Sequence, residues 1–230
     1  MVRHTSFVAA AAVIAAGGLV FPITAANAGV IDSTDIIIGV PNASLSGFTG
    51  PYANLHIDLT TNTTADITFT SLSNGGYLYM MGDGGTADLN VNGPYTLGSV
   101  VESNSVAGFT PSFKSNTPGN VSSFGTFDLS LNTNGGFTQA ATTISFTLTD
   151  TGAPWPTAAG VLTPNNDGFV AAAHTFACAE PGCSATGQAA VSGFAANGDP
   201  SPARIPEPGA LALLGSVLAV FAVGRRRRIA

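Results

Sequence analysis

Positive charge is nearly absent from the interior of this 230-residue chain, which has 7 Lys and Arg residues against 13 Asp and Glu residues. Arg3 lies near the first residue, and Arg225 to Arg228 lie near the last. Residues 29–205 retain Lys114, Arg204 and 12 acidic side chains, a formal net charge of −10. Such a surface cannot neutralise phosphates, so nucleic acid is excluded as a partner. Acidic polymers would be repelled as well, unless divalent cations bridge them.

The side chains that usually carry catalysis are also scarce in residues 29–205. This span has two histidines, His56 and His174, and two glutamates, Glu102 and Glu180. No Gly-x-Ser-x-Gly segment is present to supply a nucleophilic serine. We therefore predict a protein that is not an enzyme. The alternative is a secreted hydrolase, in which His56 and Asp58 would share one face of a strand.

The first 28 residues have the three parts of a secretory signal peptide. Arg3 gives a short positive region, residues 7–23 are mostly apolar, and Ala26-Asn27-Ala28 has the small-x-small pattern that signal peptidase recognises. Cleavage after Ala28 would start the mature chain at Gly29. The sequence therefore predicts export.

The last 26 residues combine three signals in a fixed order. Pro206-Glu207-Pro208 cannot continue a helix or a strand and favours an extended, accessible segment. Residues 210–223 are almost wholly apolar, and Arg225, Arg226, Arg227 and Arg228 follow them. This order predicts a transmembrane helix with its arginines on the cytoplasmic side. The apolar stretch is shorter than the roughly 20 residues of a full span, which favours a temporary anchor over an ordinary one.

Together, Pro206 to Pro208, the span 209–224 and Arg225 to Arg228 resemble the PEP-CTERM sorting signal of Gram-negative bacteria. The resemblance covers residues 205–230 alone. It implies cleavage near the tripeptide by an exosortase, after transient anchoring in the inner membrane. It also implies delivery to the cell surface or extracellular matrix, usually in species that make exopolysaccharide.

Alternation of apolar and polar residues dominates the rest of the chain and is typical of half-buried strands. We expect strands at residues 55–59, 67–70, 127–131 and 144–148, with further strands at 36–38, 77–80 and 100–101. Asn- and Gly-rich hairpin turns are expected at 74–76, 83–85, 92–94 and 134–136. Residues 170–176 suit either a helical turn or a packed strand.

Many short strands with glycine turns predict an all-β fold, a β-sandwich or jelly-roll-like domain spanning residues 29–192. Residues 193–204 are rich in Gly, Ala, Asn and Pro. They predict a linker that holds the domain off the membrane. Residues 205–230 form the sorting signal.

Cys178 and Cys183 are the two cysteines of the chain. In an exported protein, a close pair predicts a disulfide, and Pro181-Gly182 can turn the chain between the two sulfurs. A metal site that also uses His174 is the alternative, but structural zinc needs four ligands and this segment offers three.

We expect no cofactor, but the sequence offers two candidate ligand sites as alternatives. Asp83, Asp88 and Asn90 place oxygen ligands around glycines in a way that suits calcium, although the segment does not have the EF-hand pattern. An ordinary turn with incidental Asp residues is the competing interpretation. Trp155 lies on a loop between two prolines and could offer a flat apolar face to a sugar ring.

The sequence as a whole predicts an exported, non-catalytic protein with a structural or adhesive role among exopolysaccharides or in a biofilm. Its expected partners are signal peptidase and an exosortase during processing, and matrix components afterwards. The alternatives are a carbohydrate-binding module that uses Trp155, with or without calcium, and a secreted hydrolase.

Overall fold

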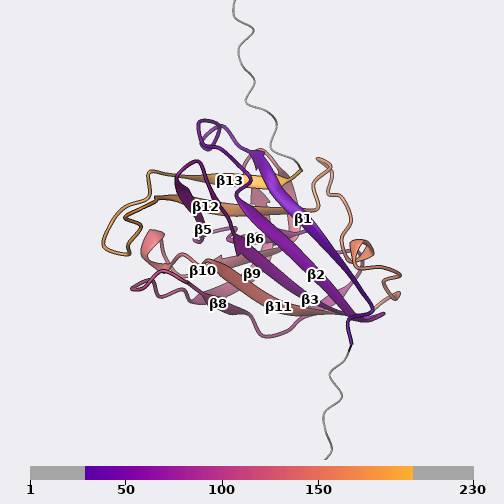
Figure 1. Ribbon diagram of the computed structural model, residues 1–230. Coiled ribbons are helices and arrows are strands. Elements are labelled where there is room, and N and C mark those ends of the chain that lie inside the picture. The colour runs from indigo at the N-terminus through magenta and orange to yellow at the C-terminus, as the bar shows by residue number, and fades with distance from the viewer. Residues whose placement is uncertain (1–28, 199–230) are drawn as a thin grey trace, which may run out of the picture.

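The computed structural model describes residues 29–198, and most of this span is antiparallel β-strand (Figure 1). Two short 3-10 helices, η1 (Phe137–Gln139) and η2 (Ala159–Val161), interrupt the strands. The strands are β1 (Asp32–Pro41), β2 (Ala53–Thr61), β3 (Thr64–Ser71), β4 (Ser73–Asn74), β5 (Tyr77–Met81), β6 (Ala87–Leu89), β7 (Tyr95–Leu97), β8 (Val101–Ser103), β9 (Phe113–Val121), β10 (Gly125–Thr133), β11 (Thr143–Asp150), β12 (Ala171–Ala179) and β13 (Val191–Asn197). The predicted all-β class is confirmed for the described residues.

The strands form one continuous antiparallel sheet that curls on itself. Its order is β7-β11-β3-β2-β1-β13-β12-β6-β10-β9, with β5 paired to β12 and β8 paired to β11 off this path. Strands β1, β2, β3 and β11 lie side by side in Figure 1, and the sheet continues from β1 through β13 and β12 to β6, β10 and β9. The chain enters and leaves the described region at opposite ends of the fold (Figure 1).

The core fills the inside of the curl. Alternation in β2 places Leu55, Ile57 and Leu59 inward, where all three are fully buried. They share one apolar cluster with residues from the other half of the sheet, such as Leu89 and Leu131. Burial of this apolar surface is the dominant favourable term in folding.

The clearest alternating segments are confirmed as strands. Residues 55–59, 67–70, 127–131 and 144–148 lie within β2, β3, β10 and β11 respectively. Residues 170–176, for which a helical turn was the alternative, lie mostly in β12. The turn at 74–76 closes the β4–β5 hairpin, with both of its glycines at positive φ.

Three of the four expected hairpins are absent from the described sheet. Strands β6 and β7, on either side of residues 92–94, do not pair with each other, and neither do β10 and β11, on either side of residues 134–136. The turn at 83–85 also differs from the prediction. Residues 82–86 leave the sheet between β5 and β6, and both of these strands pair with β12 rather than with each other. Met81 lies opposite Thr175, and Asp88 lies opposite Ala172. Residues 83–85 therefore form a bulge in an interrupted strand, which the sequence alone does not distinguish from a hairpin turn.

The predicted start of the linker at residue 193 is wrong. Strand β13 runs to Asn197 and lies between β1 and β12 in the sheet. A Cβ atom at Gly193 would lie 2.8 Å from the Asn42 side-chain oxygen and 2.9 Å from Leu45. The small residues of this segment therefore permit close packing, and the domain extends to Asn197.

Two further apolar clusters cover the outer face of the sheet around β5, β10, β12 and β13. One contains Met80, Phe109, Phe176 and Cys178, and the segment that follows the disulfide packs against it through Ala185 and Ala189. The other contains Val121, Phe124, Phe127, Ala172 and Ala196. We call this region the covered face. Within residues 29–198, no helix is long and apolar enough to cross a membrane.

Candidate functional site: the polar face

The outer face of β2, β3 and β11 has a different character. Because the inward positions of these strands are apolar, the outward positions are all polar, and each is half-buried or exposed. We call this surface the polar face. Its members are Asn54, His56, Asp58, Thr60, Thr64, Asp66, Thr68, Thr70, Thr143, Ser145, Thr147 and Thr149.

The strand register arranges these side chains in rows across the sheet. Thr68 of β3 lies opposite His56 of β2 and opposite Ser145 of β11. On one side of this row, Thr70 lies opposite Asn54 and Thr143, and on the other, Asp66 lies opposite Asp58 and Thr147. Strands about 4.8 Å apart bring such neighbours into mutual reach. The result is a regular array of hydroxyl, amide and carboxylate groups.

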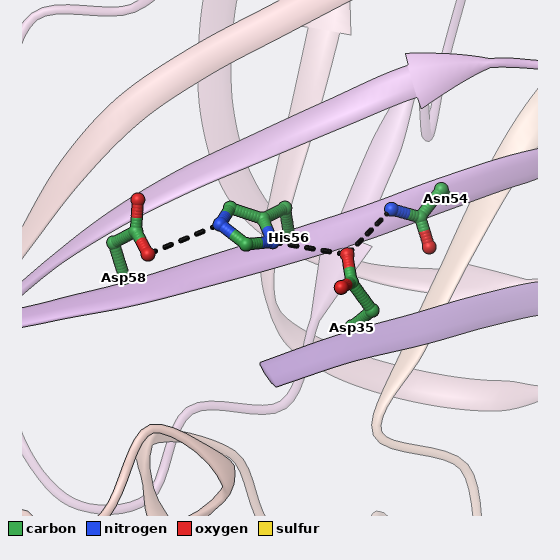
Figure 2. A network of polar contacts seen from close by, with 4 residues as sticks. All are labelled: Asp35, Asn54, His56 and Asp58. Atoms are coloured by element: carbon green, nitrogen blue, oxygen red, sulfur yellow. Dashed lines mark hydrogen bonds and ion pairs between the residues drawn. The ribbon is translucent and has the colours of Figure 1, made fainter. Parts of the chain in front are cut away.

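His56 is the centre of a hydrogen-bonded network at one edge of the polar face (Figure 2). Its Nδ1 atom lies 2.9 Å from Asp35 of β1, and its Nε2 atom lies 3.0 Å from Asp58. The Asn54 side-chain amide also donates to Asp35, at 2.8 Å. Asp35 and His56 are opposite each other in the β1–β2 register, and residues 56 and 58 share a strand face. The network therefore follows directly from the pairing of two strands.

These contacts shift the protonation equilibria of the network. The hydrogen bond to Asp35 is the main cause of a raised pKa at His56, and the charge of Asp58 adds to it. Hydrogen bonds from Asn54 and then from His56 lower the pKa of Asp35. Protonated His56 can donate from both ring nitrogens at once, which favours the charged form of the ring between two carboxylates.

The same geometry limits what His56 can do chemically. A histidine that acts as general base needs one nitrogen directed at the proton that it removes. Both nitrogens of His56 are instead engaged by Asp35 and Asp58. The residue opposite His56 on β3 is Thr68, and no hydrogen bond joins the two side chains in the described structure. The network is thus better suited to holding side chains in place than to activating a nucleophile.

Trp155 occupies a site that does not suit the predicted sugar contact. The indole is 1% exposed and belongs to the main core. Its Nε1–H donates to the Asn92 carbonyl at 2.8 Å, and its backbone N–H donates to Asn62 at 2.8 Å. The flanking prolines do place it on a loop, but the loop packs inward because the ring gains burial and keeps its polar atom satisfied. Trp155 cannot stack on a sugar from this position.

The predicted disulfide is confirmed, with Cys178 and Cys183 joined by a bond of 2.07 Å. Among residues 29–198, no group of three or more His, Cys, Asp or Glu side chains is arranged to hold a metal ion. Of the weighed calcium ligands, Asp88 is buried, and the Asn90 side chain donates to the Thr163 carbonyl at 3.0 Å. Calcium binding stays a prediction without a defined ligand set.

Two buried carboxyl groups were not distinguished by the sequence. Neither oxygen of Asp88 has a hydrogen-bond partner in the described structure, and burial raises the pKa of this residue to about 7. Glu102 of β8 also has both oxygens without partners, and burial raises its pKa to about 7. His174 contacts the bulge at residues 82–86, where its Nδ1 atom lies 2.8 Å from the Gly82 carbonyl. Burial lowers the pKa of this histidine.

Comparisons with protein-family models, with curated proteins and with solved structures found no match for this chain. The predicted signal peptide, its Ala26 and Ala28, and the sorting residues Pro206 to Pro208 and Arg225 to Arg228 lie outside the described residues. Those predictions therefore depend on the sequence alone.

Proposed function

We propose that this chain is an exported, non-catalytic protein of the cell surface or extracellular matrix, sorted by an exosortase. The tail supports the sorting step, because Pro206-Glu207-Pro208, the apolar span and the four arginines coincide in order. In this proposal the inner membrane holds the chain only until cleavage. The mature domain then has a structural or adhesive role among exopolysaccharides.

The observation that carries the adhesive role is the polar face. It combines an open array of hydrogen-bonding groups with a network in which His56 is held between two carboxylates. Such a surface can make many weak contacts to a hydrated polymer without any reaction. The same observation argues against the hydrolase alternative, since neither nitrogen of His56 is directed at a hydroxyl nucleophile.

We also propose that the fold is of the β-sandwich type. The support for this assignment is the main apolar cluster, which joins inward residues of β2, β3 and β11 to inward residues of β6, β10 and β12. In this description the two halves of the curled sheet act as the two layers.

The proposed function is tested by intact mass and cell fractionation of the protein from its own host, beside a strain that lacks the exosortase. We expect the host form to begin at Gly29, to end near Pro206 and to occur outside the cell. The deletion strain should keep a longer, membrane-bound form. Retention of Arg225 to Arg228 in both strains would reduce the tail to a plain anchor and exclude the matrix role.

A deletion of the gene for this chain tests the adhesive role separately from sorting. We expect weaker cohesion of flocs or biofilm, restored by the wild-type chain. The matched variant replaces His56 with Gln, which preserves the fold and removes the charged ring. If the chain were a hydrolase with His56 as its general base, this variant would abolish an enzymatic activity. In the adhesive role, the same variant would only weaken adhesion.

A further inference from the structure

We infer that the polar face binds uncharged polysaccharide, with the hydroxyls of Thr68, Thr70, Thr143 and Ser145 as the central contacts. This inference depends on the proposed matrix function and names its ligand class and its surface. It differs from the sequence-based hypothesis of a sugar site at Trp155, because that ring is buried in the core.

The first support is the contrast between the two outer faces of the sheet. The covered face is closed by the protein's own Phe109, Phe124 and Phe176 and by the segment that follows the disulfide. No described segment closes the polar face in the same way, and its side chains are exposed or half-buried. It is therefore the outer surface of the sheet that is available to a large partner.

The second support is the division of hydrogen bonds on the polar face. Asp35, Asn54, His56 and Asp58 are joined in one network, and Thr147 donates to Asp66 at 2.7 Å. Thr68, Thr70, Thr143 and Ser145 take part in none of these bonds and lie together in the register. Four neighbouring hydroxyls thus keep both donor and acceptor capacity, while the groups around them are already fixed. Fixed surroundings reduce the entropy that is lost when a ligand binds.

The charges of the polar face select the kind of polysaccharide. It contains Asp58 and Asp66 and borders Asp35, but it has no Lys or Arg. The single Lys or Arg of residues 29–198, Lys114, lies on β9, the last strand of the sheet order. A polyanion would meet these carboxylates, and the one cation that this face can offer, protonated His56, is already engaged by Asp35 and Asp58. The hydroxyls of a neutral sugar can instead donate to the carboxylates and exchange hydrogen bonds with the threonines.

The spacing of the strands suits a long polymer better than a single sugar. Rows across β2, β3 and β11 repeat along the strands about every 6.8 Å, the distance between residues i and i+2. The outward positions of the three strands hold no Phe, Tyr or Trp, so binding would come from many weak polar contacts along a chain. Such binding depends on the number of contacts and falls steeply when the ligand is shortened.

The test uses the full-length chain in mild detergent and measures retention on an insoluble neutral glucan. The variant Thr68→Val, Thr70→Val, Thr143→Val removes three hydroxyls but keeps β-branched side chains on the strands. The control variant Thr110→Val, Thr117→Val, Thr138→Val makes the same change at three exposed threonines away from the polar face. Thermal unfolding of both variants confirms that each is folded.

We expect the wild type and the control variant to bind alike, and the polar-face variant to bind at least about tenfold more weakly, because each lost hydroxyl contact costs a factor of several. Equal binding by both variants would overturn the inference. Retention only on a polyanion or a polycation would also overturn it. The inference would also be overturned if sedimentation showed that the loss of binding reflects self-association of the chain through the polar face.

This result can be separated from the test of the proposed function. A chain that binds the glucan through its polar face but stays in the inner membrane contradicts the sorting proposal and leaves the binding surface established. A chain that is exported and processed but does not bind the glucan contradicts only the present inference.

Discussion

The two halves of the sheet present opposite kinds of outer surface. On the polar face, every outward residue of β2, β3 and β11 is polar. On the covered face, outward residues such as Met80, Phe127 and Phe176 are apolar and buried under loops of the same chain. One sheet therefore contains a region that is closed by the protein itself and a region that is open to a partner.

The sequence pattern explains this difference. Strands β2, β3 and β11 alternate strictly between apolar and polar residues, as expected for a sheet with one solvated face. Strands β5 and β12 are apolar at most positions of both parities, Tyr77–Met81 and Ala171–Ala179. A strand that is apolar on both sides has to be covered on both sides. Loop segments and the disulfide supply that second cover.

The largest expected effect comes from replacing one outward residue on each face and comparing the two losses of stability. Phe127→Ala on the covered face should lower the free energy of unfolding by about 3–5 kcal/mol, because Phe127 is fully buried. Thr68→Val on the polar face should change it by less than about 0.5 kcal/mol. Urea unfolding measures both values. Similar losses in the two variants would mean that the polar face is also part of the packed interior.

The second expected effect concerns Asp88, which lies under the bulge 82–86. Its pKa is raised to about 7, so the folded state binds a proton more tightly than the unfolded state does. Stability from this group is greatest below the ordinary pKa of 3.8 and is lost as pH rises through about 7. The loss should be on the order of a few kcal/mol.

Asp88→Asn removes this titration and is measured by urea unfolding between pH 4 and pH 8. Glu102 changes stability in the same direction, and His174, with its lowered pKa, favours unfolding as pH falls. The difference between wild type and variant isolates the contribution of Asp88. A difference that does not vary with pH would show that Asp88 has an ordinary pKa.

A smaller effect is expected at the disulfide, which anchors the segment over the covered face. Cys178→Ala with Cys183→Ala should cost about 2 kcal/mol or less, because the closed loop is short. Thermal unfolding with and without reductant measures the change. Reductant should lower the midpoint of the wild type and leave that of the variant unchanged. No shift in the wild type would exclude a stabilising role for this bond.

The smallest effect belongs to His56 on the polar face. Its raised pKa means that its stabilising contacts are fully present below the ordinary value of 6.5 and are lost as pH rises through the folded value. Because the side chain is 38% exposed, solvent screening keeps the contribution below about 1 kcal/mol. NMR titration of the ring should give a lower pKa in Asp35→Asn than in wild type. An unchanged pKa would contradict the network.

Much of the fold could be predicted because strict alternation is a local signal. Residues 55–59, 67–70, 127–131 and 144–148 all lie in strands. Strand β9 was missed because Phe113–Val121 is polar and contains Pro118, which suits an edge strand that pairs on one side. Strand β13 was mistaken in part for a linker because its small residues resemble a flexible segment.

The candidate site was only partly predictable, because its contacts join residues far apart in the sequence. The relation of His56 to Asp58 follows from strand parity alone. The contact with Asp35 depends on the β1–β2 register, which the sequence does not specify. The location of Trp155 was missed for a similar reason. Its flanking prolines predict a loop, but they do not say that the ring packs inward against the core.

The central claim is that the polar face is the surface through which this domain meets its partner. NMR chemical-shift mapping of the isotope-labelled chain, as isolated from its host, with a soluble neutral glucan tests it most directly. The account predicts shifts at Thr68, Thr70, Thr143 and Ser145 that saturate with glucan, and little change at Phe109 or Phe176. Shifts confined to the covered face, or no shifts at saturating glucan, would contradict it.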